Sequence, residues 1–63
     1  MATYYVGPNG NDSNNGESVE TAWKTVGHAE NTMAINDNTI TINANKENII
    51  MRKSGVGSLL YSS

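Results

Sequence analysis

The chain opens on a strand, a polar loop and the entry to a helix, in the sequence TYYVGPNGNDSNNGESVETAWKTV at residues 3–26. Thr3–Val6 is β-branched and aromatic, which predicts a short strand. Gly7 and Pro8 end this strand, and residues 9–16 follow with two Asn-Gly pairs, which mark turns that need a positive φ. The opening therefore predicts a strand followed by a turn-rich loop.

A short helix is expected at residues 21–33. Thr25 is a suitable N-cap, and Val26, Ala29 and Met33 then share one face at spacings i, i+3 and i+7. A glycine inside the stretch costs about 1 kcal/mol relative to alanine. The helix therefore depends on packing against the rest of the chain.

Turn-forming residues separate three further strand-like stretches, at residues 39–43, 48–52 and 58–61. The first alternates strictly, so Ile40 and Ile42 share one face, which is the pattern of a half-buried strand. A turn is expected at residues 45–47 and another at the glycines of residues 55–57. The resulting class is α+β, mostly β: a short N-terminal strand, an Asn/Gly-rich loop, one short helix and then about three short strands.

Sixty-three residues make one small domain, with the opening strand, loop and helix at 3–35 and the short strands at 36–63. A chain this short buries only about 60% of the surface that its unfolded form exposes, and comparable scaffolds add disulfides, a metal or a partner. The chain has no cysteine and one histidine, which excludes a disulfide and a structural zinc site. Association with a partner is the remaining way to stabilise a chain of this size. The expected core is aliphatic: Val6, Trp23, Val26, Met33, Ile35, Ile40, Ile42, Ile49, Ile50, Met51, Leu59 and Leu60.

The composition excludes several classes of function. The chain carries four basic and six acidic side chains, for a net charge of −2. Its basic residues are mostly scattered, so a surface that neutralises nucleic-acid phosphates is not expected. No apolar run approaches the roughly 20 residues of a membrane span. We therefore expect neither nucleic acid nor a membrane as partner.

The sequence shows no recognisable catalytic constellation, cofactor motif or metal-ligand set, so we do not expect an enzyme. His28 is the only imidazole, and it lacks a recognisable carboxylate partner for general base catalysis. The loop at residues 9–17 invites a calcium interpretation, because hard cations prefer oxygen ligands. Only Asp12 and Glu17 carry charge there, so a network of asparagine turns is the better account.

Residues 4–16 together with Ala22–Val26 resemble the start of right-handed parallel β-helix proteins, the pectate-lyase-like superfamily that includes polysaccharide lyases and phage tailspikes. In that family an opening strand of the type Tyr-Tyr-Val-Ser-Pro precedes an Asn/Asp/Gly-rich loop. An aromatic-Lys-Thr-Ile entry then leads into a short helix that caps the open end of the β-helix. Residues 37–42 are similar to the first rung, with one inserted residue, and residues 48–55 resemble the next stretch.

The resemblance implies a truncated β-helix cap-like unit. The catalytic lysines and arginines and the calcium-binding aspartates of the lyases sit on later rungs, so none is carried over to this sequence. Secreted lyases need export, whereas tailspikes and other virion proteins fold in the infected cell, and the start Met-Ala-Thr-Tyr-Tyr-Val lacks a basic, apolar leader. We therefore expect a non-enzymatic, phage-type virion structural protein, tail-associated or capsid-decorating and assembled in the host cytoplasm.

Two alternatives stay open from the sequence. The first is a truncated cap fragment of a secreted carbohydrate-active β-helix enzyme. The second is a small carbohydrate-binding module that uses Tyr4, Tyr5 and Trp23 as a sugar platform.

Seven aromatic or large apolar residues are the candidates for structural or interface roles: Tyr4, Tyr5, Trp23, Met33, Met51, Leu59 and Leu60. Trp23 is the most informative of them. We interpret it first as a core anchor for the helix, with a hot spot at an interface as the alternative. The methionines and leucines add more apolar surface than a unit of this size easily hides. The expected partners are therefore further copies of the chain, other virion proteins, or both.

Overall fold

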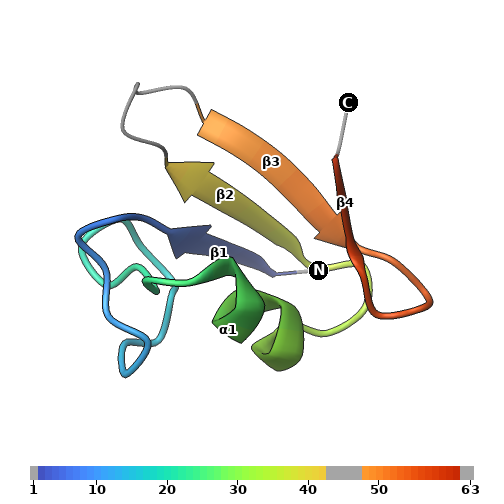
Figure 1. The fold of residues 1–63 in the computed structure, drawn as a ribbon, viewed down its shortest axis with the longest axis horizontal. Coiled ribbons are helices and arrows are strands. Elements are labelled where there is room, and N and C mark those ends of the chain that lie inside the picture. Colours follow the sequence, from blue (N-terminus) through green and yellow to red (C-terminus); the bar gives the residue numbers. More distant parts are fainter. Residues whose placement is uncertain (1, 43–47, 62–63) are drawn as a thin grey trace.

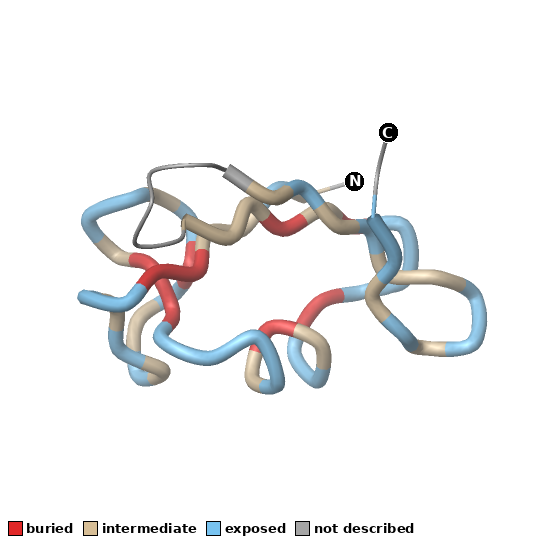
Figure 2. Tube along the Cα trace, turned by 45° about the horizontal axis from the view of Figure 1, so that its top comes forward, coloured by how far each residue is buried: buried red, intermediate tan, exposed pale blue. Residues whose placement is uncertain are grey.

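The computed structural model describes residues 2–42 and 48–61. It contains four strands and one helix: β1 (Thr3–Val6), α1 (Val26–Thr32), β2 (Asn38–Ile42), β3 (Asn48–Lys53) and β4 (Leu59–Tyr61). The strands form one sheet in the order β1-β2-β3-β4, in which β1 and β2 are parallel and the other pairs are antiparallel. The helix lies in the connection from β1 to β2 and covers one side of the sheet (Figures 1 and 2). A small α+β fold that is mostly β is thus confirmed, and the turn expected at residues 45–47 lies outside the described residues.

The helix is shorter than the sequence pattern predicts. It begins at Val26, with Thr25 as its N-cap, and the Thr25 hydroxyl accepts a hydrogen bond from the backbone N–H of His28 at 3.3 Å. The expected start at residue 21 is wrong because Trp23 instead forms a parallel bridge with Val6. Strand pairing therefore holds the chain extended up to the cap, and the helix starts one turn later.

The edge of β1 that does not pair with β2 is covered by Gly16 and Trp23. The backbone N–H of Tyr5 donates to Gly16 O at 2.7 Å, and the N–H of Trp23 donates to Tyr5 O at 2.9 Å. The N–H of Gly7 in turn donates to Trp23 O at 2.9 Å. These bonds satisfy backbone groups that an edge strand otherwise leaves open, so β4 is the open edge of the described sheet.

The side of the sheet that faces the helix carries threonine where isoleucine was expected. Tyr4 pairs with Thr39 in the β1–β2 register, and directly paired residues point to the same face. Tyr4 packs against the core, so Thr39 and Thr41 face the helix while Ile40 and Ile42 point away. Thr39 is fully buried. The alternation shows which residues share a face, but it cannot tell which of the two faces the helix covers.

The core is consequently smaller than the sequence suggested. It consists of Val6, Trp23, Ala29 and Met33, with Tyr4 and Leu59 packed against it. Four members of the expected core are instead exposed: Val26, Ile35, Ile50 and Leu60. Ile40 and Ile42 are half-buried, because the neighbouring strands cover only their flanks.

The two threonine hydroxyls on the helix side find no partner. The Oγ1 atoms of Thr39 and Thr41 are buried, and neither has a hydrogen-bond partner in the described part of the chain. Burying a hydroxyl without a hydrogen bond costs about 1–3 kcal/mol in proteins. The two hydroxyls on the inner face of β2 therefore cost stability.

Replacing Thr39 with valine is therefore expected to stabilise the protein by about 1 kcal/mol, because the side chain keeps its shape and loses the unpaired hydroxyl. The measurement is the free energy of unfolding by denaturant. Thr3→Val is the matched control on the exposed opposite face, and its effect should lie within about 0.5 kcal/mol. A loss of stability in Thr39→Val would show that the buried hydroxyl does have a hydrogen-bond partner.

Candidate functional site

Trp23 sits at the centre of the core. Its ring stacks on Tyr4, with centroids 4.8 Å apart and an angle of 17° between the ring planes, and His28 meets it edge-on at 5.0 Å. The indole Nε1 donates to the backbone oxygen of Asn14 at 2.7 Å. The side chain is only 2% exposed, which confirms the expectation of a buried anchor and leaves Trp23 unavailable to a partner.

Glycines shape the seat of this indole ring. Gly16 has φ of 73°, a value that favours glycine, and a Cβ there would lie 2.6 Å from Cε2 of Trp23. A Cβ on Gly10 would lie 2.1 Å from the backbone oxygen of Trp23. The two Asn-Gly pairs therefore provide close approach to Trp23, and one of them also provides the positive φ that the sequence suggested.

The polar loop is a network of asparagine and aspartate turns. Asn11 and Asn15 each accept a bond on Oδ1 from the backbone N–H two residues on, at 2.8 and 2.9 Å. Asp12 accepts from the N–H groups of Lys24 and Thr25 at 2.9 and 3.0 Å, and from the Thr25 hydroxyl at 2.8 Å. The Asp12 carboxylate thus fixes the start of the helix, and the network agrees with the turn interpretation of the loop.

Trp23→Ala is expected to cost about 3–5 kcal/mol, which is comparable with the whole stability of a domain this small. Thermal unfolding measures the effect. Trp23→Phe keeps a ring but loses the bond to Asn14 O, so it should stay folded with a lower melting temperature.

His28→Ala is the companion variant. His28 is half-buried, and its ring meets the edge of Trp23. Loss of the edge contact should therefore cost about 1 kcal/mol.

A Trp23→Ala protein with the melting temperature of the wild type would contradict the role of Trp23 as the core anchor.

Asp37 ties the N-terminal end of the described chain to the end of the helix. Its Oδ1 accepts from the N–H of Ala2 at 2.8 Å, and its Oδ2 accepts from the N–H of Ala34 at 3.0 Å. The bond from Ala2 lowers the pKa of Asp37 below its ordinary value of 3.8, and the bond from Ala34 lowers it further. Burial raises this pKa, but the hydrogen bonds outweigh it. Burial also raises the pKa of Asp12, but the bonds from Thr25 and Lys24 outweigh it, so that pKa is lowered too.

Because the folded-state pKa of Asp37 is depressed, the stability that its carboxylate contributes is present above pH 3.8 and is lost as pH falls through the folded-state value. The melting temperature should therefore decline in acid below that pH. Asp37→Asn should lower the melting temperature at neutral pH and flatten the acid decline. Glu17→Gln, at an exposed position of the loop, is the control that should keep the decline of the wild type.

The seven residues that the sequence singled out fall on different sides of the sheet. Trp23 and Met33 are buried in the core, Tyr4 and Leu59 pack against it, and half-buried Met51 pairs with Thr39 on the helix side. Tyr5 and Leu60 lie on the opposite side. Trp23 and Tyr4 are stacked in the interior while Tyr5 points away from them, so these three rings do not form a common platform for a sugar.

The side of the sheet away from the helix, called the outer face here, carries apolar side chains at its centre and a polar row of Thr3, Asn38 and Arg52 toward one end. One row across its centre consists of Tyr5, Ile40 and Ile50, which pair in register. Ile42 lies at one end of the face, and Leu60 lies at the other beside its pairing partner Arg52. Ile50 and Leu60 are 45% and 54% exposed, and no described helix or strand lies over this face (Figure 2). The sequence pattern assigned Ile40 and Ile42 to the core, and the structure does not place them there. The alternation nevertheless put both residues correctly on the same face of the strand.

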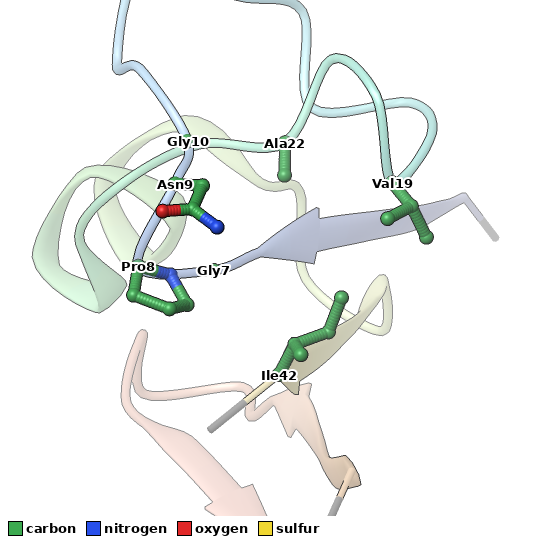
Figure 3. A pocket seen from close by; sticks show the side chains of 7 residues that line it. All are labelled: Gly7, Pro8, Asn9, Gly10, Val19, Ala22 and Ile42. Atoms are coloured by element: carbon green, nitrogen blue, oxygen red, sulfur yellow. The ribbon is translucent and has the colours of Figure 1, made fainter. Parts of the chain in front are cut away.

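A pocket of about 240 Å³ borders the outer face at the ends of β1 and β2 (Figure 3). Its lining is uncharged: Gly7, Pro8, Asn9, Gly10, Val19, Ala22 and Ile42. Ile42 belongs to the outer face, and Val19, an apolar residue in the polar loop, is more than half exposed beside it. The sequence analysis missed Val19 and Pro8, for which the only signal was an isolated apolar side chain among polar neighbours.

Comparison of the chain with protein-family models, with curated proteins and with solved structures finds no match. Within residues 2–42 and 48–61, no group of three or more histidine, cysteine, aspartate or glutamate side chains is placed to hold a metal ion. The one helix described is also too short to cross a bilayer. The outer face with its pocket is the surface feature that remains to be explained.

Proposed function

We propose that this protein is a non-enzymatic, phage-type virion structural protein, tail-associated or capsid-decorating, which acts through subunit contacts made by its outer face. The observation that carries the proposal is the orientation of β2. Its threonines are turned toward the helix and its isoleucines toward solvent. A sheet that needs no partner buries its larger apolar side chains under its own helix, because that burial stabilises the fold. An exposed contiguous apolar patch is the usual mark of an interaction site.

The resemblance to the N-terminal cap of parallel β-helix proteins is part of the same proposal. A strand, an Asn/Gly-rich loop, a helix and a second strand parallel to the first follow one another in cap order. β3 and β4 run antiparallel and depart from the stacked parallel coils of that family. The cap-like part proposed for this chain is therefore the segment from β1 to β2.

The outer face also offers the chemistry that subunit contacts require. Its centre is apolar and aromatic, and Arg52 is the one charged side chain that the strand registers place on it. Protein interfaces have this arrangement, with charged residues depleted at the core and polar groups at the rim.

The test is to follow a tagged copy of the protein in a lysate of infected cells that contains the phage particles. Density-gradient sedimentation and immunogold electron microscopy are expected to place it on the particles. Ile50→Lys puts a charge at the exposed centre of the face and should abolish incorporation. Val56→Lys, at a position 89% exposed in the turn before β4, is the control that should leave it intact.

Both variants are first compared with the wild type by thermal unfolding, so that a failure to fold is not read as a failure to assemble. A wild-type protein that stays free of the particles would overturn the proposed function. So would incorporation of a folded Ile50→Lys protein at the wild-type level.

A further inference from the structure

The outer face carries two complementary corners at opposite ends of one diagonal. At one corner, where the parallel strands β1 and β2 end, the pocket opens between Val19 and Ile42. At the other corner, β4 presents Leu60 next to Arg52 of β3. The row of Tyr5, Ile40 and Ile50 runs between them.

We propose that the outer face binds the outer face of a second copy of this chain, with the pocket of each copy receiving Leu60 of the other. This pairing rests on the proposed function, in which the protein acts through subunit contacts, and it names the partner and the residues that make the contact.

The size and chemistry of the two corners match. A pocket of about 240 Å³ has the volume of roughly eight water molecules in the liquid, at about 30 Å³ each, which is ample for the four carbons of a leucine side chain. Its lining is uncharged and includes Pro8, Val19 and Ile42. Leu60 is 54% exposed, so the side chain is available without any change in the fold.

The charges beside the two corners are opposite. Val19 is followed at once by Glu20, and Glu17 lies two positions before it; both carboxylates are on exposed residues. Arg52, also exposed, lies beside Leu60. When Leu60 enters the pocket of the other copy, its neighbour Arg52 approaches the acidic residues around Val19. Such rim pairs set specificity and register more than affinity.

One symmetry operation makes both contacts at once. A twofold axis that lies in the plane of the face, along its other diagonal, exchanges the two corners and brings each pocket against the partner's Leu60. The strands of the two sheets then cross near 90°, which is one of the two ways in which sheets pack face to face. The contact is isologous and closed, and the central rows of the two copies cross each other at the axis.

The area predicts a weak dimer. Four strands about 4.8 Å apart and about 17 Å long present a face on the order of 300 Å², to which the rim of the pocket adds. A standard interface buries about 800 Å² on each partner. We therefore expect a weak, reversible dimer rather than a permanent one.

The experiment is sedimentation velocity on the full chain over low to high micromolar concentrations, with four proteins: the wild type, Leu60→Ser, Arg52→Glu and Glu20→Arg. The wild type should form a dimer. Leu60→Ser should bind itself at least about tenfold more weakly, which corresponds to about 1.4 kcal/mol. Val56→Ser is the matched control at an exposed apolar residue that lies in the turn before β4 and outside the paired strands, and it should dimerise like the wild type.

The two charge variants test the geometry. Each alone places like charges at both corner contacts of its homodimer and should dimerise less than the wild type. An equimolar mixture restores opposite charges at both contacts, so a heterodimer should form. A wild-type chain that stays monomeric, a dimer indifferent to Leu60, or a mixture without heterodimer would each overturn the inference.

These outcomes are separable from those of the proposed function. A monomeric chain that still sediments with the particles overturns only the pairing of two copies. A dimer that never sediments with them overturns only the virion role.

Discussion

The buried indole ring of Trp23 is the interaction on which the rest of the structure depends. Its backbone pairs with β1, its ring stacks on Tyr4, its N–H holds the polar loop, and its edge meets His28 of α1. The other core side chains are small or flexible, so this ring provides the largest rigid surface in the interior. The same ring dictates the glycine at residue 16, because any side chain there would collide with it.

Local patterns in the sequence were sufficient for the elements. β-branched and aromatic residues located β1, alternation located β2, and Thr25 was correctly identified as a helix cap. The start of the helix was wrong because a bridge between Trp23 and Val6, which are far apart in sequence, overrides local helix propensity. Only part of the candidate surface could be predicted from the sequence. Period-two alternation brings Ile40 and Ile42 together, but the parallel register with β1 decides that they face outward.

Both faces of the sheet carry apolar side chains, but the helix covers only one of them. On the helix side, the buried threonine hydroxyls oppose folding, while on the outer face Ile50 and Leu60 remain in contact with water. A monomer therefore forgoes part of the hydrophobic stabilisation that its composition allows. In the subunit contact proposed above, burial of the outer face would add stabilisation that a chain of 63 residues without cysteine cannot obtain from a disulfide.

The parallel pairing of β1 with β2 also governs the order in which the sheet forms. Ala2 and Asp37, which are bonded to each other, are separated by 35 positions, whereas β2, β3 and β4 follow one another through short connections. The loop-closure entropy is larger for the first pairing, and non-local strand contacts form slowly. We therefore expect the antiparallel meander of β2, β3 and β4 to form before the parallel pairing of β1 with β2. On this expectation β1, the first strand along the chain, joins the sheet last, and the surroundings of Trp23, which pairs with β1, form in the same step.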